Sequence, residues 1–329
     1  VLKQHGWKDG VLRYPTERDL LDNWKGILYR NNNDIDRLGK YPLTDGEMTQ
    51  IIEQIETLRT PLALNSFVNG RTVSITRDNK EDVAHFGKEV SLYIYDRKEI
   101  AGGKSTYQIA QQPVYPAKNK MLNSRRGDLV LLINGMPLIQ IELKKSGIPV
   151  SQATNQIEKY AHEGVFTGLF RLVQIFVAMN PDDAVSFANP GVDKFNPSYY
   201  FHWADYNNEP ICGGQNPGKD EWKLFIGGTS GTAGLLSIPM AHQLIGFYTI
   251  ADSADGCLKV LRSYQYIAAN AISDVVRKCD WEQRPATPGR PGGYVWHTTG
   301  SGKTMTSFKS AQLIADSHDA DKVVFLMDR

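Results

Sequence analysis

Alternation of apolar and polar positions over the first half of the chain predicts several β-strands that lead into a β-hairpin. The candidate strands are residues 71–78, 90–96 and 105–116. The hairpin candidate is the segment 127–145, GDLVLLINGMPLIQIELKK, in which Asn134-Gly135 separates two apolar runs. Asn and Gly both tolerate positive φ, so this pair predicts the turn. Because the runs are apolar on both faces, we expect them inside a buried sheet.

Helical patterns surround these strands. Residues 15–60 are typical of helices, with Thr16-Glu17 near one start and a capping sequence at 44–47 before a helix over 48–59. Residues 152–162 predict another helix, and the fully apolar run 170–180 predicts a central strand. The segment 181–222 is rich in Asn, Pro and aromatic residues and predicts an irregular lobe. Aromatic packing is favoured there over stacking on DNA bases.

The amino-acid composition of the chain changes after this lobe. Residues 224–251 carry no formal charge, but Gly, Pro and hydroxyl residues interrupt them too often for a membrane-spanning helix. We interpret this stretch as a buried connection between two domains. Residues 258–276 then predict an amphipathic helix, and the proline- and glycine-rich run 284–293 separates it from the last part of the chain.

Acidic and basic side chains gather at one end of the predicted hairpin. Side chains of a strand alternate between faces, so Glu142 and Lys144 share one face, with Gln140 before them. A three-residue loop would place Asp128 opposite Glu142, and a two-residue loop would place it opposite Ile141. Two crowded carboxylates repel unless a cation lies between them, and such oxygen ligands suit Mg²⁺. The alternative is that these charges are simply solvated at a strand end.

The helix after the hairpin adds two polar residues to this pattern. Gln156 and Tyr160 are four residues apart, so they lie on the same helix face. The complete pattern, D-x13-E-x-K followed by Q-x3-Y, resembles the PD-(D/E)xK nuclease core. More narrowly, it resembles the nuclease domain of the restriction (R) subunit of type I restriction-modification enzymes. That family usually has a proline before the first acid, where this chain has Gly127.

The resemblance implies a role for each residue of the pattern. Asp128 and Glu142 would hold Mg²⁺, and Lys144 would stabilise negative charge on the nucleophile or on the phosphorus centre. Gln156 and Tyr160 would position the site or the DNA backbone. It also implies an α/β fold, in which a mixed sheet is flanked by helices.

Residues 297–304, HTTGSGKT, form a second motif, between a predicted strand at 294–296 and a predicted helix at 304–315. Strand, glycine-bearing loop and helix are the context of a phosphate-binding loop for ATP. In such a loop the glycines let backbone N–H groups approach a polyphosphate, and the helix N-terminus favours its charge. Lys303 would reach the β- and γ-phosphates, and Thr304 would ligate Mg²⁺. The nucleotide-binding residues predicted here are Thr299, Gly300, Ser301, Gly302, Lys303 and Thr304.

His297 departs from the usual form of this loop, which has Gly or Ala at that position, although the resembled R subunits share HTTGSGKT. We interpret His297 as a packed loop histidine. Residues 323–327 predict a parallel strand and look like motif Ia of superfamily 2 motors. Arg262 and Gln265 lie where that superfamily has its adenine-reading glutamine motif, or else they are polar residues on an exposed helix face. No acidic motif that would complete ATP hydrolysis follows in this sequence.

The amino-acid composition excludes few classes of function. With 37 Lys and Arg against 36 Asp and Glu, the net charge of +1 excludes a histone-like basic surface, so any nucleic-acid contact must be a local groove. The three cysteines, Cys212, Cys257 and Cys279, lack metal-binding spacing and fit a reducing cytoplasm. The first residues look like the tail of a helix that stops near Gly6.

Together these patterns predict a nuclease domain over residues 1–245 and the truncated start of a RecA-like P-loop motor domain over 246–329. The resemblance implies a fragment of an ATP-dependent, DNA-translocating endonuclease that hydrolyses double-stranded DNA with Mg²⁺. It would act in the cytoplasm, with methyltransferase and specificity subunits and without a membrane. Two alternatives remain open. One is an ATP-gated repair or defence nuclease outside type I systems, and the other is a non-catalytic ATP-binding scaffold.

Overall fold

The computed structural model describes residues 1–116, 125–192, 194–213, 220–278 and 293–326. They form two compact units, of which the first comprises Val1–Trp203 and Pro210–Val260 and the second Ala204–Glu209 and Leu261–Arg329. By compactness the chain therefore divides near Val260. The division into functional domains at residue 245 stays a prediction.

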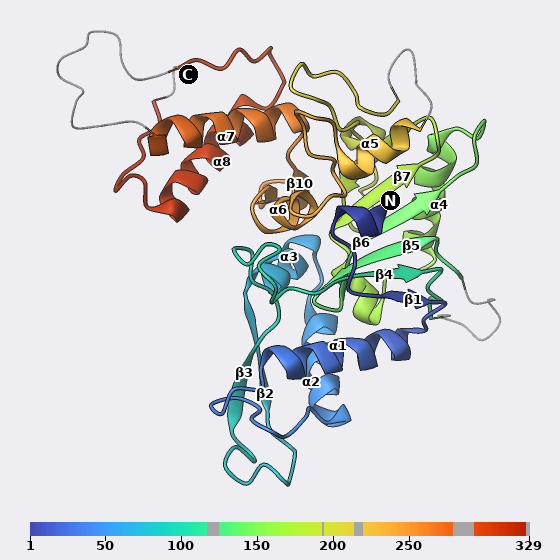
Figure 1. The fold of residues 1–329 in the computed structure, drawn as a ribbon, viewed down its shortest axis with the longest axis vertical. Helices are drawn as coiled ribbons and strands as arrows, with labels where there is room; N and C mark the ends of the chain where they lie inside the picture. Colours follow the sequence, from blue (N-terminus) through green and yellow to red (C-terminus); the bar gives the residue numbers. More distant parts are fainter. Residues whose placement is uncertain (117–124, 193, 214–219, 279–292, 327–329) are drawn as a thin grey trace. The chain divides into compact units, whose positions relative to one another are not determined.

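A six-stranded mixed sheet forms the centre of the first unit (Figure 1). Its strands, in spatial order, are β1 (Val11–Arg13), β4 (Tyr107–Gln111), β5 (Leu129–Ile133), β6 (Met136–Leu143), β7 (Ile175–Met179) and β8 (Ala184–Ala188). The pairs β1–β4 and β6–β7 are parallel, and the others are antiparallel. The predicted hairpin is confirmed, whereas the run 170–180 forms an inner strand only over Ile175–Met179, after a 3-10 helix at Gly168–Leu172. The expectation that 181–222 is entirely irregular is wrong, because β8 closes one edge of the sheet.

Helices surround this sheet. They are α1 (Glu17–Asn31), α2 (Asp45–Thr57), α3 (Pro61–Asn69), α4 (Val150–His162), α5 (Glu221–Gly227) and α6 (Met240–Gly246), with short 3-10 helices at Leu2–His5, Gly168–Leu172 and Pro197–Tyr199. Thr16 and Thr44 both cap their helices through complete capping boxes, as the sequence at 44–47 predicts. Helix α4 packs on β6 and β7. Its apolar residues join Phe176 and Phe187 in one buried cluster, which fixes the helix against the sheet.

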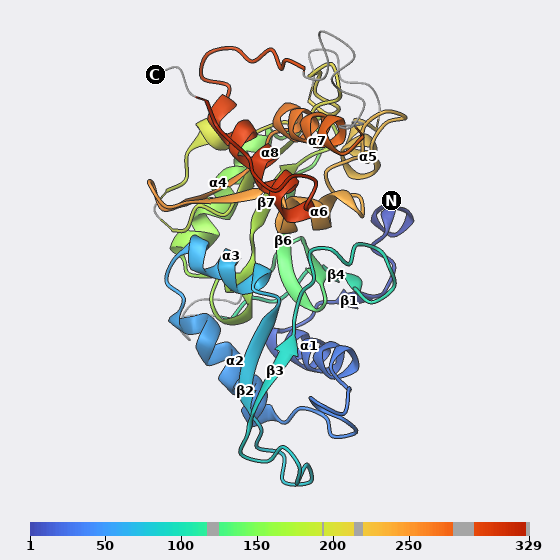
Figure 2. The same cartoon turned by 90° about the vertical axis from the view of Figure 1, so that its left-hand side faces the viewer.

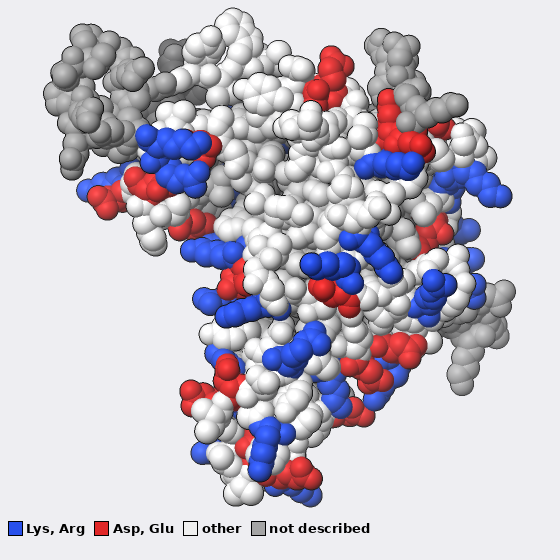
Figure 3. Space-filling view, in the orientation of Figure 1, with Lys and Arg blue, Asp and Glu red and all other residues white. Residues whose placement is uncertain are grey.

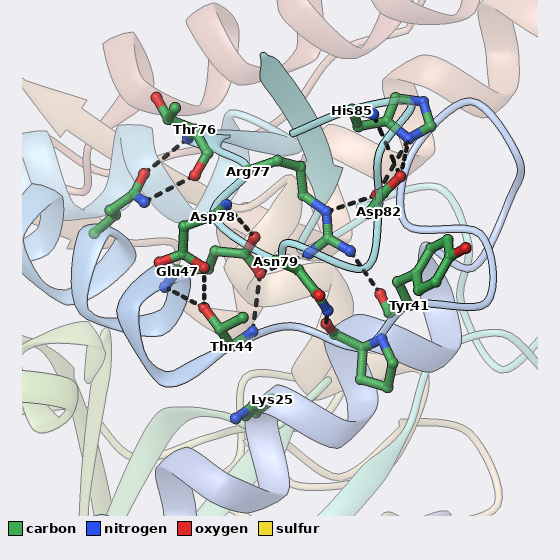
Figure 4. A network of polar contacts seen from close by, with 12 residues as sticks. Lys25, Tyr41, Thr44, Glu47, Thr76, Arg77, Asp78, Asn79, Asp82 and His85 are labelled. Atoms are coloured by element: carbon green, nitrogen blue, oxygen red, sulfur yellow. Dashed lines mark hydrogen bonds and ion pairs between the residues drawn. The ribbon is translucent and has the colours of Figure 1, made fainter. Parts of the chain in front are cut away.

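A two-stranded antiparallel ribbon, β2 (Thr72–Thr76) and β3 (Glu89–Tyr93), lies beside α2 and α1 (Figure 2). Arg77 holds the end of this ribbon at which the loop between its strands begins, and its buried guanidinium contacts Glu47, Asp82 and the carbonyl oxygen of Tyr41 (Figure 4). These contacts occupy donors from all three guanidinium nitrogens, so the charge is compensated although it is shielded from water.

The uncharged stretch 224–251 belongs to the first unit. It contributes α6, most of α5 and part of a second ribbon, formed by β9 (Thr249–Asp252) and β10 (Cys257–Val260). Its side chains Phe225, Leu236 and Leu244 are buried. Among the described residues, the helices are all too short or too polar to cross a membrane.

The second unit contains two helices within its described residues, α7 (Ser263–Lys278) and α8 (Lys303–Ser317), and they pack together. The predicted helix over 258–276 begins later than expected, because Leu258 belongs to β10. The strands predicted at 294–296 and 323–327 are wrong for the residues described, which belong to no helix or strand. Trp296 and Leu326 are 87% and 95% exposed, so these segments lack the neighbouring strands that would complete their backbone hydrogen bonds. Residue 327 and most of the run 284–293 lie outside the described residues.

Candidate functional site

The register of the β5–β6 hairpin decides whether the two carboxylates meet. Asn134 and Gly135 have φ values of 52° and 82°, which makes a two-residue turn. Such a turn alone would set Asp128 opposite Ile141, but a β-bulge at Leu131/Leu132 shifts the register by one residue. Beyond the bulge Leu129 pairs with Ile141, so the register continues with Asp128 opposite Glu142.

Asp128 and Glu142 form the acidic half of the site. One carboxylate oxygen of Asp128 accepts a hydrogen bond from the backbone N–H of Leu143 at 2.8 Å, which ties the end of β5 to β6. The side chain of Glu142 is buried, with 1% of its surface exposed. Burial, and then the nearby negative charge of Asp128, raise the pKa of Glu142 to about 8.

Lys144 joins this acidic pair to helix α4. Its Nζ lies 3.3 Å from Oε1 of Glu142 and donates a hydrogen bond to Oε1 of Gln156 at 2.5 Å. Nε2 of Gln156 donates to the hydroxyl of Tyr160 at 2.6 Å, and that hydroxyl donates to the carbonyl oxygen of Arg126 at 3.3 Å. The structure therefore brings all five residues of the predicted pattern together in one chain of contacts.

Two further residues border this site, Gln140 and Tyr115. The Tyr115 hydroxyl donates to Oε1 of Gln140, and the Tyr115 ring packs against Tyr160 and Phe170. Burial raises the pKa of Tyr115 well above its ordinary value, with a smaller effect from the negative charge of Glu142, so the phenol stays protonated. Alternation along β6 points to Gln140, but no local signal points to Tyr115, because that contact joins segments 25 residues apart.

Tyr115 also gives a physical reason for Gly127, the residue that replaces the proline usual in the resembled family. A Cβ atom at position 127 would overlap the Tyr115 ring and hydroxyl. The aromatic ring therefore occupies the space that a larger residue would need at the entry to β5.

The donor set fits a divalent cation with oxygen ligands. Oε2 of Glu142 and Nε2 of Gln140 are buried, and neither has a hydrogen-bond partner within the described residues. A carboxylate oxygen without a partner, beside a second carboxylate, is an environment that a cation would relieve. In the part of the chain that the structure describes, no three His, Cys, Asp or Glu side chains gather as a metal-binding group. One or two carboxylates, completed by waters and substrate phosphate, is the usual protein environment of Mg²⁺.

The predicted phosphate loop lies in the second unit. Gly300 and Gly302 have φ values of 79° and 83°, in the left-handed region that glycine adopts without strain. Gly302 caps α8, so Lys303 and Thr304 occupy the first turn of that helix, and both are exposed. Thr299 is exposed as well, whereas the Ser301 hydroxyl donates to the carbonyl oxygen of Thr298 at 2.7 Å. The free first turn of a helix favours an anion.

Gln265 braces this loop from α7. It is only 3% exposed, and its Nε2 donates to the carbonyl oxygens of Ser301 and Gly302 at 3.2 and 3.4 Å. The alternative that Gln265 lies on an exposed helix face is therefore wrong, while a role in reading adenine stays a prediction.

Arg262 precedes α7 and contacts the Tyr264 hydroxyl at 3.2 Å, and that hydroxyl bonds to the carbonyl oxygen of Ser301. The His297 ring packs edge-on against Tyr264, in agreement with its interpretation as a packed loop histidine.

Comparison with known proteins decides the family. The family model described as the N terminus of the type I restriction enzyme R protein matches residues 2–195. This chain belongs to that family. A second family model, described as SWI2/SNF2 ATPase, matches residues 264–329, which include the predicted phosphate loop and α8.

Three relatives support the assignment to the R protein family. Type I restriction enzyme endonuclease subunits from Staphylococcus saprophyticus and from Staphylococcus aureus are each 32% identical to this chain over its full length. The chain spans about 30% of the length of these relatives. The EcoprrI endonuclease subunit of Escherichia coli is 29% identical, over 64% of this chain and 62% of its own length.

Proposed function

We propose that this chain works as part of the ATP-dependent, DNA-translocating endonuclease subunit of a type I restriction-modification system. Its first unit would be a nuclease with a PD-(D/E)xK core, and its second unit would begin a RecA-like P-loop motor domain. The observation that carries the proposal is the buried Glu142 carboxylate, which lies beside Asp128 and Lys144 and has one oxygen without a hydrogen-bond partner in the described part of the chain.

In this proposal Asp128 and Glu142 would hold Mg²⁺. When bound, the ion supplies Lewis-acid stabilisation of the charge that develops on the phosphodiester. Lys144 is held at the same place by Gln156, so its ammonium group is oriented to compensate negative charge at the reacting phosphate. Tyr160 in turn fixes the amide of Gln156. The contacts of Lys144 with Glu142 and Gln156, and of Gln156 with Tyr160, therefore limit the movement of this ammonium group beside the acidic pair.

ATP would bind at the phosphate loop. The backbone of 299–302 would surround the β- and γ-phosphates, Lys303 would compensate their charge, and Thr304 would offer its hydroxyl to Mg²⁺. In a complete cytoplasmic enzyme we expect double-stranded DNA as substrate, and methyltransferase and specificity subunits as partners.

The test uses the complete endonuclease subunit assembled with its partners. We expect Glu142→Ala to lower the rate of DNA cleavage by at least about 10²–10³-fold, the loss typical of removing a charge-stabilising group from a reacting centre. ATP-driven translocation should persist, because the phosphate loop lies in another unit. Lys303→Ala is the matched variant and should abolish ATP binding. Cleavage at a near wild-type rate in Glu142→Ala would exclude this nuclease site.

A further inference from the structure

A polar groove borders the candidate nuclease site along α4. It has a volume of about 430 Å³ and is lined by Arg125, Gln152, Asn155, Gln156, Lys159 and Tyr160. Gln156 and Tyr160 belong to the chain of contacts that ends at Lys144, so the groove is continuous with the nuclease site. The other four residues have no part in the mechanism described above.

The spacing of these residues along α4 places them on one helix face. Positions 152, 155, 156, 159 and 160 are separated by three or four residues, so their side chains form a continuous row. From Gln152 to Lys159 the helix rises by about 10 Å, at 1.5 Å per residue. A DNA strand advances about 3.4 Å per nucleotide along its axis, so the row is roughly as long as three nucleotides.

The two cations of the groove are accessible and share one counter-ion. Nε and Nη2 of Arg125 contact the two carboxylate oxygens of Glu163 at 2.9 and 2.8 Å. Nζ of Lys159 lies 3.9 Å from the same carboxylate. The Arg125 and Lys159 side chains are 42% and 64% exposed, so an incoming anion can reach both. Figure 3 shows Lys and Arg gathered along the right-hand edge of the view, where Figure 1 places the ends of β5 and β6 and helix α4.

We propose that this groove binds the phosphate backbone of the DNA strand that enters the nuclease site, with Arg125 and Lys159 as phosphate contacts. Glu163 is their counter-ion in the free protein, and a phosphate takes its place when DNA binds. The amides of Gln152 and Asn155 donate to neighbouring phosphate oxygens. This proposal rests on the nuclease function proposed above and assigns the position of its substrate.

Because Glu163 and a DNA phosphate would compete for the same two cations, the proposal predicts substitutions that weaken DNA binding and one that strengthens it. Removing Arg125 or Lys159 removes a phosphate contact, whereas neutralising Glu163 frees both cations. Arg125→Gln and Lys159→Gln should therefore weaken DNA binding, and Glu163→Gln should strengthen it. A defect in folding weakens binding in every variant, so the opposite sign for Glu163→Gln separates the proposed role from a structural one.

The measurement is the affinity of the complete endonuclease subunit for a duplex without a recognition site, over a range of salt concentrations. Every variant also carries Glu142→Ala, which prevents cleavage during the measurement. Each lost phosphate contact should reduce the slope of log affinity against log salt by about 0.9. A reduction of the slope by about 0.9 corresponds to roughly fivefold weaker DNA binding at about 0.15 M salt. Lys88→Gln, an exposed lysine in the loop between β2 and β3, is the control and should leave the slope unchanged.

The possible outcomes separate the two proposals. A slope that falls in Arg125→Gln and Lys159→Gln but not in Lys88→Gln supports the groove. Unchanged slopes in both groove variants, together with loss of cleavage in Glu142→Ala, overturn the groove and keep the nuclease site. Weaker binding in Glu163→Gln also overturns the groove, because it contradicts the counter-ion role. Cleavage that survives Glu142→Ala overturns the nuclease function itself.

Discussion

Glu47 and Glu142 are both buried in the first unit, but their carboxylates meet different surroundings. Both oxygens of Glu47 are satisfied. One accepts from Arg77 at 2.6 Å and from the backbone of Thr44, and the other accepts from the backbone of Asp78. One oxygen of Glu142 lies 3.3 Å from Nζ of Lys144, and its other oxygen has no hydrogen-bond partner among the described residues.

This difference separates a structural charge from a candidate functional one. In the network of Figure 4 the Arg77 guanidinium is compensated by protein groups, so the network needs no ligand, and it holds the loop end of the β2–β3 ribbon. The Glu142 carboxylate lacks such compensation, so its burial and, after that, the nearby negative charge of Asp128 raise its pKa to about 8. An incomplete buried carboxylate costs stability, and a bound cation can recover that cost.

Breaking the closed network should have the largest effect on stability. Arg77→Met leaves the buried carboxylates of Glu47 and Asp82 without their cation, so we expect the free energy of unfolding to fall by about 3–5 kcal/mol. Urea unfolding of the whole chain measures this change. Arg18→Met removes an arginine from exposed ion pairs on α1 and should change little. Equal effects of the two substitutions would contradict a structural role for the buried network.

Neutralising the Glu142 carboxylate should raise the free energy of unfolding, whereas Arg77→Met should lower it. The pKa of Glu142 is raised from 4.5 to about 8, so between these pH values the native state keeps a proton that the unfolded state has lost. Metal-free protein should therefore lose stability as pH rises from about 4.5 to 8, by an amount on the order of a few kcal/mol. Glu142→Gln should remove this loss and be more stable than wild type at pH 8.

Adding Mg²⁺ at pH 8 sharpens this comparison. Wild-type protein should gain stability because the ion binds the native state, whereas Glu142→Gln should gain much less. Thermal unfolding with and without Mg²⁺ measures both effects. A stability that does not depend on pH between 4.5 and 8 in wild-type protein would show that Glu142 is not held in the environment described.

The smallest effect concerns the two capping boxes. Thr44 caps α2, and its box partner Glu47 also binds Arg77, whereas Thr16 caps α1 with the exposed Asp19. Thr44→Ala should cost about 1–2 kcal/mol of unfolding free energy, and Thr16→Ala about 0.5–1 kcal/mol. Chemical denaturation of the two variants tests whether the buried network adds to the value of a cap. If Thr16→Ala lowers the free energy of unfolding more than Thr44→Ala does, the buried Arg77 network adds nothing to the effect of the Thr44 cap.

The sequence alone determined the features that depend on neighbouring residues. Thr44 and Glu47 form a capping box because both lie in the same turn, and Asn134-Gly135 makes a turn because both residues accept positive φ. Alternation along one strand placed Glu142 and Lys144 on one face, and glycines at 300 and 302 gave the loop its backbone conformation. These arguments need no knowledge of distant contacts.

Only the tertiary structure decided the features that depend on distant partners. The sequence left two registers open for Asp128, and the bulge in the β5–β6 pairing selected the one that places it opposite Glu142. Tyr115 reached Gln140 across the fold, and Gln265 bonded to the phosphate loop instead of facing solvent. The apolar residues at 323–326 formed no strand, since a strand also needs a paired neighbour. The local sequence pattern limits which secondary structures a segment can adopt, and its contacts with distant segments decide which of them it adopts.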